Sequence, residues 1–159
     1  MLLVITQGAV SLNAQNPLEI KGPYLGQEPP GDSSVVFMPG FVSTEAGELN
    51  AVFCCEGNEF YFSRRGVPGK SSVLMMTKRE KDGWSVPEEL EFTGMYSDID
   101  LFITPDGKSL VFCSRRPYNE GEDEKSEHDF WIATRNGNTW SEPIPFAPEA
   151  ISEFEDFFP

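Results

Sequence analysis

A short pattern of turn and strand residues occurs twice in this chain. Residues 56–63 and 106–113 each combine a glycine turn with a strand-like run, and the turn glycines, Gly57 and Gly107, are 50 residues apart. Each copy later ends in a Trp-Ser-x-Pro element that follows a Gly or Asn and closes at Pro87 or Pro143. Self-similarity at a period of about fifty residues indicates an architecture of repeated units. The repeat therefore constrains the fold more than any single motif does.

The second copy is longer than the first, and partial copies flank the pair. Trp84 and Trp140 are 56 residues apart, so the extra residues fall in the acidic stretch 117–126, which we interpret as a loop. Residues 37–43 also match 146–152 in their Phe, Pro and Ser positions. The chain thus holds two complete units and parts of two more.

Each unit is predicted to contain four short antiparallel strands. Aromatic and β-branched residues dominate the runs that we expect to be the first three strands of each copy, as is typical of pleated, half-buried segments. No stretch shows a sustained helical period of apolar residues, so little helix is expected. The expected strand ranges are, in chain order, 49–53, 60–64, 73–77, 100–104, 110–114 and 130–134.

Glycine and proline mark the turns and the outer edge of each predicted unit. Gly57 and Gly107, the latter beside Asp106, supply the positive φ that tight hairpins need. The fourth strand of each copy carries Pro87 or Pro143. Because proline has no N–H for a β-ladder, this strand belongs at a sheet edge. We therefore predict an all-β fold of four-stranded antiparallel sheets, arranged as blades of a partial β-propeller.

One run of residues resembles a known repeat. Residues 104–115 read Thr-Pro-Asp-Gly-Lys-Ser-Leu-Val-Phe-Cys-Ser-Arg, which resembles the WD-like β-propeller repeat of TolB-type proteins. The Asp-Phe-Trp sequence that starts at Asp129 and the Trp-Ser-x-Pro turns are similar to that family too. The resemblance covers residues 37–159, and it departs at 54–56, where Cys-Cys-Glu replaces Thr-Pro-Asp. It implies a propeller and a habit of binding partners, because propellers host unrelated functions on one scaffold.

Composition divides the chain into three segments. Residues 1–14 resemble the end of a truncated secretory signal segment without its basic start; an ordinary disordered or strand-forming start is the alternative. Residues 15–36 are rich in Pro, Gly and polar residues and are expected to be an extended arm or linker. Residues 37–159 are expected to form the partial propeller, with about two full blades and fragments of their neighbours.

Chain length bears on how a ring of blades would close. Propellers have about 4–8 four-stranded blades, so 159 residues are expected to form part of one. We expect either a truncated chain or copies that close a ring between chains. A membrane-spanning helix needs about 20 consecutive apolar residues. The sequence has no such stretch, so we expect no membrane insertion.

The charge of the chain is strongly acidic. Twelve Lys and Arg residues stand against 26 Asp and Glu residues, for a formal net charge of −14. Such a surface repels phosphate backbones, so we expect no nucleic-acid partner. The acidic run 120–124 is interpreted as a solvated loop. A calcium site is the alternative, although calcium requires about 6–8 oxygen ligands in a shaped site.

Catalytic and metal-binding patterns are missing from the sequence. The three cysteines, Cys54, Cys55 and Cys113, lack the spacing of a zinc site, so we assign no metal ligand and no cofactor. Free thiols are expected, with one disulfide as the alternative in an exported protein. Adjacent strand residues point to opposite faces, which separates the thiols of Cys54 and Cys55 and also separates His128 from Asp129. We therefore name no catalytic residue.

Two arginine pairs and two tryptophans recur at matching places. Arg64, Arg65, Arg115 and Arg116 end the second strands and could offer forked donors to a carboxylate-bearing ligand. The alternative is a salt bridge to the acid that begins a following strand, such as Asp129. We favour this structural role, because a contact repeated in every unit usually builds the unit. For the same reason the tryptophans, Trp84 and Trp140, are expected to pack between sheets.

Two functions follow as hypotheses. The first is a non-catalytic binding or scaffold module, periplasmic or secreted, that presents a propeller face to a protein or peptide. The alternative is the ligand- or substrate-binding part of a secreted hydrolase or lyase that acts on glycans or peptides. Uncovered blade faces and sheet edges are also expected to promote self-association.

Overall fold

The computed structural model describes residue 22 and residues 24–146 of the chain. The proposed signal segment 1–14, residues 15–21 and 23 of the predicted arm, and residues 147–159 lie outside the described residues. The described part is all-β, with two short 3-10 turns, η1 (Tyr24–Gly26) and η2 (Cys55–Gly57). Its strands are β1 (Gly47–Cys54), β2 (Glu59–Arg65), β3 (Ser72–Glu80), β4 (Gly83–Trp84), β5 (Glu88–Glu89), β6 (Asp98–Ile103), β7 (Ser109–Ser114), β8 (Asp129–Asn136), β9 (Thr139–Trp140) and β10 (Ile144–Pro145).

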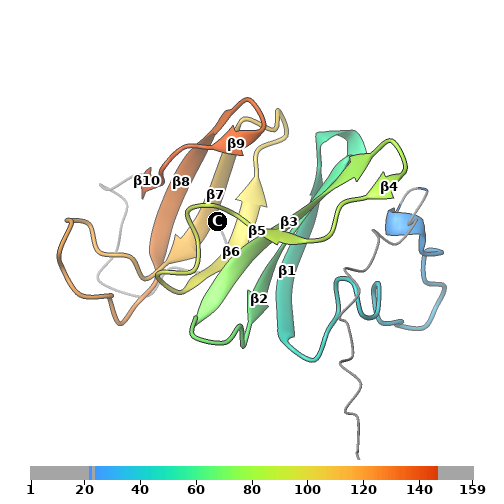
Figure 1. Cartoon of the computed structure of the whole chain (residues 1–159), viewed down its shortest axis with the longest axis horizontal. Coiled ribbons are helices and arrows are strands. Elements are labelled where there is room, and N and C mark those ends of the chain that lie inside the picture. Colours follow the sequence, from blue (N-terminus) through green and yellow to red (C-terminus); the bar gives the residue numbers. More distant parts are fainter. Residues whose placement is uncertain (1–21, 23, 147–159) are drawn as a thin grey trace, which may run out of the picture.

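The strands form two antiparallel sheets that share one pattern (Figure 1). In the first sheet β1, β2 and β3 pair in order, and both β4 and β5 pair with the free edge of β3. In the second sheet β6, β7 and β8 pair in order, and both β9 and β10 pair with β8. The predicted all-β, antiparallel fold class is confirmed.

The outer edge of each sheet differs from the single fourth strand that we predicted. Each edge consists of two two-residue strands, and Pro87 and Pro143 lie between the two pieces. The Trp-Ser corner that begins each edge is bonded identically in both sheets: Ser85 N donates to Lys78 O at 2.9 Å, and Ser141 N donates to Thr134 O at 2.9 Å. The edge breaks after this corner because proline contributes no N–H to the ladder.

The first strand of each sheet carries a bulge at the same place. Pairing with the neighbouring strand shifts register after Leu49 in β1 and after Ile99 in β6. Asn50 (φ +35°) and Asp100 (φ +47°) have left-handed backbone at these shifts. A bulge adds an unpaired residue and increases local twist, so both sheets bend in the same way.

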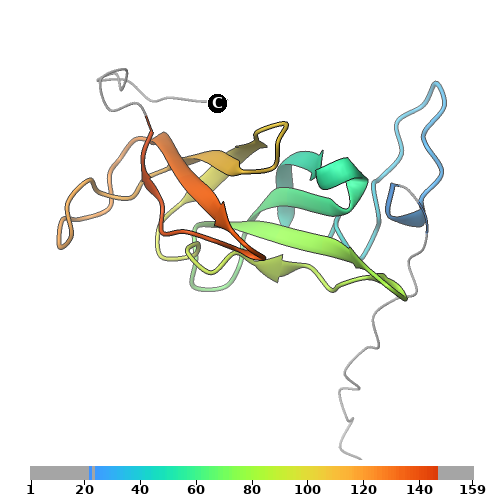
Figure 2. The same ribbon diagram turned by 90° about the horizontal axis from the view of Figure 1, so that it is seen from above.

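The main core lies between the two sheets. Tyr61 and Leu74 from the first sheet, both fully buried, pack in one cluster with Leu110 and Phe112 from the second. β6 lies against β1, β2 and β3, so the second sheet stacks across a face of the first (Figure 2). Side chains alternate between faces along a strand, which leaves the other face of the first sheet to be covered separately.

The described residues that precede β1 cover that other face. Leu25, Phe41 and Val42 are buried in a second cluster with Phe60 and Phe62 of β2. Figure 2 shows this N-terminal segment, in blue, at the end of the molecule away from the second sheet. The first sheet is therefore apolar on both faces, and both are packed.

Candidate functional site

Arg64, one of the predicted ligand-binding arginines, is engaged inside the first sheet. Its Nε donates to Glu48 Oε1 at 3.1 Å, and its Nη2 donates to the carbonyl oxygen of Val42 at 3.0 Å. The guanidinium also lies over the ring of Phe62, 5.1 Å from the centroid. Thr44 Oγ1 donates to the same Glu48 oxygen at 2.8 Å. These contacts fix β1 against β2 rather than leave the cation for a ligand.

Arg116 makes the equivalent set of contacts in the second sheet. Its Nη2 donates to both oxygens of Asp98, at 3.0 and 3.2 Å, and its Nε donates to Ser114 Oγ at 2.9 Å. The guanidinium lies over the ring of Phe112, again 5.1 Å from the centroid. Thr93 Oγ1 donates to Asp98 at 2.8 Å, as Thr44 does to Glu48. Burial raises the pKa of Asp98, while Arg116 and Ser114 oppose that shift.

We call these two sets of contacts, around Arg64 and around Arg116, the arginine sockets. The acid in the second socket is not the one that we predicted. The acid that Arg116 binds begins the first strand of its sheet, whereas we expected Asp129 at the start of the third; Asp129 instead pairs with Lys125. Ser114 occupies the ladder position that Arg64 has in the first sheet, opposite the carboxylate. In the second sheet the guanidinium therefore comes from Arg116, two residues after Ser114. Residues two apart in an extended chain lie on the same side of it.

The remaining two arginines, Arg65 and Arg115, do not form a socket of this kind. Arg65 is exposed at the end of β2. The backbone N of Arg115 donates to Ser97 O at 3.1 Å, and its side-chain Nε is buried without a hydrogen-bond partner in the described structure. The described contacts thus use Arg64 and Arg116 for structure and assign no ligand to any of the four.

A buried Ser–His contact appears that the sequence did not suggest. His128 Nε2 lies 3.3 Å from Ser97 Oγ, although the two residues are 31 positions apart. Their exposed fractions are only 5% and 6%, so both side chains are buried. The contact joins the long loop before β8 to the start of β6.

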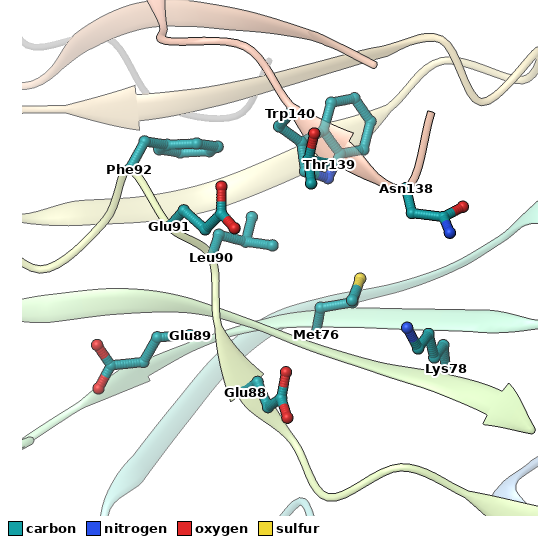
Figure 3. Close-up of a pocket in the computed structure, with 10 residues that line it drawn as sticks. All are labelled: Met76, Lys78, Glu88, Glu89, Leu90, Glu91, Phe92, Asn138, Thr139 and Trp140. Atoms are coloured by element: carbon teal, nitrogen blue, oxygen red, sulfur yellow. The ribbon is translucent and has the colours of Figure 1, made fainter. Parts of the chain in front are cut away.

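A groove runs between the two sheets at their outer edges, and Figure 3 shows its lining. Its volume is about 140 Å³. Apolar side chains from both sheets and polar side chains with net negative charge line it. We call it the inter-sheet groove; its residues are Met76, Lys78, Glu88, Glu89, Leu90, Glu91, Phe92, Asn138, Thr139 and Trp140.

The carboxylates of the inter-sheet groove differ in their partners. Lys70 pairs with Glu89, whose side chain points away from the others in Figure 3. Glu88 and Glu91 are exposed and have no ion-pair partner in the described part of the chain. Both therefore remain available to a cation that enters the groove.

The turn between β1 and β2, residues 54–57, gathers a different set of groups, and we call it the cysteine turn. Cys55 (φ +56°) and Glu56 (φ +58°) both have left-handed backbone. The prediction that the adjacent thiols face opposite ways is wrong, because Cys55 leaves the strand and enters η2. Both sulfur atoms lie beside the second sheet: a Cβ on Gly107 would be 3.1 Å from Cys55 Sγ and 3.6 Å from Cys54 Sγ.

Glu59, at the start of β2, connects the cysteine turn to the second sheet. Its Oε2 accepts hydrogen bonds from Tyr61 Oη at 2.7 Å and from Arg135 Nη2 at 2.7 Å, and the Cys55 thiol donates to it at 3.4 Å. Arg135 Nε in turn donates to Gly107 O at 2.6 Å. The guanidinium of Arg135 stacks on Trp140, 4.5 Å from the ring centroid. One charged network thus ties the two sheets together.

This network shifts the proton affinities of its members. Burial, followed by the hydrogen bonds to Cys54 and Glu59, raises the pKa of the Cys55 thiol to about 12. Burial favours the neutral form of Glu59, but hydrogen bonds from Arg135 and Tyr61 outweigh it and lower the pKa of that carboxyl. At neutral pH the network holds a neutral thiol beside a carboxylate and a guanidinium.

The residues predicted to build the repeat lie at matching places in the two sheets. Gly57 and Gly107 have φ values of +76° and +69°, in the left-handed region that their turns require. Trp84 is 1% exposed in the cluster under the arm, and Trp140 packs at the edge of the core between the sheets. Trp84 therefore covers a sheet face, while Trp140 both packs against the core and lines the inter-sheet groove.

No family model, curated protein sequence or solved structure matches this chain. In the described part of the chain, no helix has the length and apolar character that crossing a membrane requires. Function must therefore be inferred from the groove and the network described above.

Proposed function

We propose that this chain is a non-catalytic binding module of the β-propeller type, periplasmic or secreted, and that a protein or peptide segment docks in its inter-sheet groove. The acidic rim above an apolar floor is the observation that carries this proposal. Glu88 and Glu91 supply the rim, while Leu90, Phe92 and Trp140 supply the floor. Such a site suits a basic side chain, whose aliphatic stem lies on apolar surface while its charge meets carboxylates.

The size of the inter-sheet groove favours a side chain over a free metabolite. Its volume of about 140 Å³ lies below the range of roughly 300–1,000 Å³ that is typical of small-molecule sites. A net charge of −14 also attracts basic segments over a distance. Both features favour a basic peptide or protein loop as the partner.

The propeller-type arrangement is supported by hydrogen bonds that recur in both sheets. Arg79 N donates to Asn58 O at 2.7 Å, and Arg135 N donates to Lys108 O at 2.8 Å, at the same corner of each sheet. The stacking of β6 across the first sheet and the weak outer edges are also typical of neighbouring blades. In this arrangement the inter-sheet groove lies between blades at their outer edges.

Nuclear magnetic resonance titration of the full, isotope-labelled chain tests the proposed function. The probes are acetylated Gly-Ser-X-Ser-Gly peptides in which X is Arg, Leu or Glu. We expect the Arg peptide to shift the amide signals of Lys78, Asn138 and Thr139, and the Glu peptide to shift none of them. Binding should weaken in Glu88→Gln/Glu91→Gln.

Glu45→Gln is the matched control, because Glu45 is an exposed carboxylate that does not line the groove. Signals that respond equally to all three peptides, or that shift only outside the groove, would contradict the proposal. A response to a neutral oligosaccharide alone would favour the substrate-binding part of a secreted hydrolase or lyase instead.

A further inference from the structure

We propose that the cysteine turn is a metal site in which Cys54, Cys55 and Glu59 bind one divalent thiophilic cation of the zinc class. The proposal is independent of the inter-sheet groove. One ligand atom from each of the three residues lies within 4.8 Å of the other two. Zinc bonds sulfur at about 2.3 Å and carboxylate oxygen at about 2.0–2.2 Å in a tetrahedron. Cys55 Sγ lies 3.4 Å from Glu59 Oε2, which is close enough for both atoms to bind one such ion.

The backbone of the cysteine turn explains how adjacent cysteines reach one point. Side chains of neighbouring strand residues diverge, but the left-handed conformations of Cys55 and Glu56 fold the chain back. A left-handed backbone strains a non-glycine residue, and such strain gathers at functional sites. The equivalent residues of the other turn, Pro105 and Asp106, have no positive φ. The strained form is therefore particular to the turn that carries the thiols.

The second sheet completes the surroundings of the site. Gly107 has no side chain, which leaves room for both sulfur atoms. Arg135 Nη2 lies 3.5 Å from Cys55 Sγ and also holds Glu59. Two thiolates and one carboxylate carry three negative charges, which a divalent cation and the guanidinium neutralise together. Charge balance of this kind is what a partly buried ionic site needs.

A cation can reach the site from solvent. A cleft of about 310 Å³ opens beside the turn and is lined by Cys54, Cys55, Thr104 and Pro105, among others. Cys55 is half-buried and Cys54 is 8% exposed. Binding forms two metal–sulfur bonds and releases the two thiol protons to solvent. Glu59 binds through a carboxylate oxygen, and no oxidant or reductant is consumed.

Cadmium and zinc titrations of the reduced, full-length chain test the site. We expect an ultraviolet sulfur-to-cadmium charge-transfer band that saturates at one Cd²⁺ per chain, and competition by Zn²⁺. The band should be lost in Cys54→Ser and in Cys55→Ser. Affinity should fall at least about tenfold in Glu59→Gln, since even an outer-shell change costs about 10–100-fold.

Cys113→Ser is the matched control, because Cys113 is a buried thiol on β7 outside the site, and it should keep the band. Should the serine variants unfold, protection of the wild-type thiols from alkylation gives the same information. Zn²⁺ should then protect Cys54 and Cys55 but leave the reactivity of Cys113 unchanged. Absence of the band in reduced wild-type protein, a band that persists without both turn cysteines, or equal protection of all three thiols would overturn the proposal.

Discussion

The two turns that follow the first strands occupy equivalent places but are stabilised differently. In residues 104–107, Asp106 Oδ1 accepts hydrogen bonds from Thr104 Oγ1 at 2.6 Å and from Lys108 N at 3.1 Å, so the turn satisfies its own polar groups. In the cysteine turn no hydrogen bond of the Glu56 carboxylate is found among the described residues; the carbonyl oxygen of Cys55 accepts from Asn58 N at 3.1 Å and from Asn58 Nδ2 at 3.0 Å instead, and both thiols lie beside the second sheet. The side chain of Asp106 thus stabilises its own turn, whereas the thiols of the cysteine turn make contacts between the sheets.

The two arginine sockets also occupy equivalent places but differ in how deeply they are buried. Both combine a carboxylate, a threonine hydroxyl, a phenylalanine ring and a guanidinium. Arg116 and Asp98 have side chains only 9% and 0% exposed, whereas Arg64 and Glu48 are 16% and 15% exposed. The second socket is the drier of the two, so its charges depend more strongly on each other.

The largest effect is expected from breaking the drier socket. Arg116→Ala leaves the Asp98 carboxylate buried without its cation, which should lower the free energy of unfolding by about 3–5 kcal/mol. Arg64→Ala should cost only about 1–2 kcal/mol, because Glu48 can turn toward water. Urea denaturation of both variants measures the difference. Equal losses would show that the two sockets are energetically alike.

A smaller effect is expected at the turn glycines. Gly107→Ala places a methyl group 3.1 Å from Cys55 Sγ in a left-handed residue, so it should cost about 2–4 kcal/mol from backbone strain and crowding together. Gly57 has the same backbone but open space around its Cβ position. Gly57→Ala should therefore cost only about 1–2 kcal/mol. Chemical denaturation of both variants measures the two losses in free energy of unfolding. A larger loss for Gly57→Ala would contradict the prediction.

Replacing the acid before each turn glycine by glycine should change the free energy of unfolding in opposite directions. Glu56→Gly removes strain from a left-handed residue and should raise the free energy of unfolding by about 0.5–1 kcal/mol. Asp106→Gly removes the acceptor for Thr104 and Lys108 and should lower it. Thermal unfolding of the two variants under one set of conditions reports both signs, and a shared sign would refute the contrast between the turns.

The smallest effect concerns acid sensitivity. Hydrogen bonds from Thr104 and Lys108 lower the pKa of Asp106. A carboxyl with a lowered folded-state pKa stabilises the fold above its unfolded value of about 3.9, and that contribution is lost as pH falls through the folded-state pKa. The stability advantage of wild type over Asp106→Asn should therefore be full at neutral pH and shrink in acid. An advantage that is constant with pH would exclude this role.

The strands and the edges of the sheets were predictable because they depend on local sequence. Runs of aromatic and β-branched residues between turns predicted the six main strands to within a few residues, and proline placed the fourth strand at the sheet edge without predicting that it divides into two pieces. The partners of the arginines were not predictable in the same way. Arg115 and Arg116 are adjacent, and only the register of β6 against β7 decides which one faces Asp98.

The cysteine turn was the part of the candidate site that local reasoning missed. A strand rule applied to Cys54 and Cys55 separates their thiols, yet the left-handed backbone at Cys55 brings them together. The departure from Thr-Pro-Asp to Cys-Cys-Glu was visible in the sequence. The contacts that these residues make could not be predicted, because Gly107 and Arg135 belong to the other sheet. They lie beside the turn only once the two sheets are stacked.

The interrupted outer edges determine how this molecule can contact further strands. An intact edge offers a continuous row of N–H and C=O groups to any passing chain, but here Pro87 and Pro143 divide that row into two-residue pieces. Strand addition at the outer edge of either sheet is therefore disfavoured. The face-to-face stacking of the two sheets is made by side chains of the shared core and does not require an unbroken strand edge.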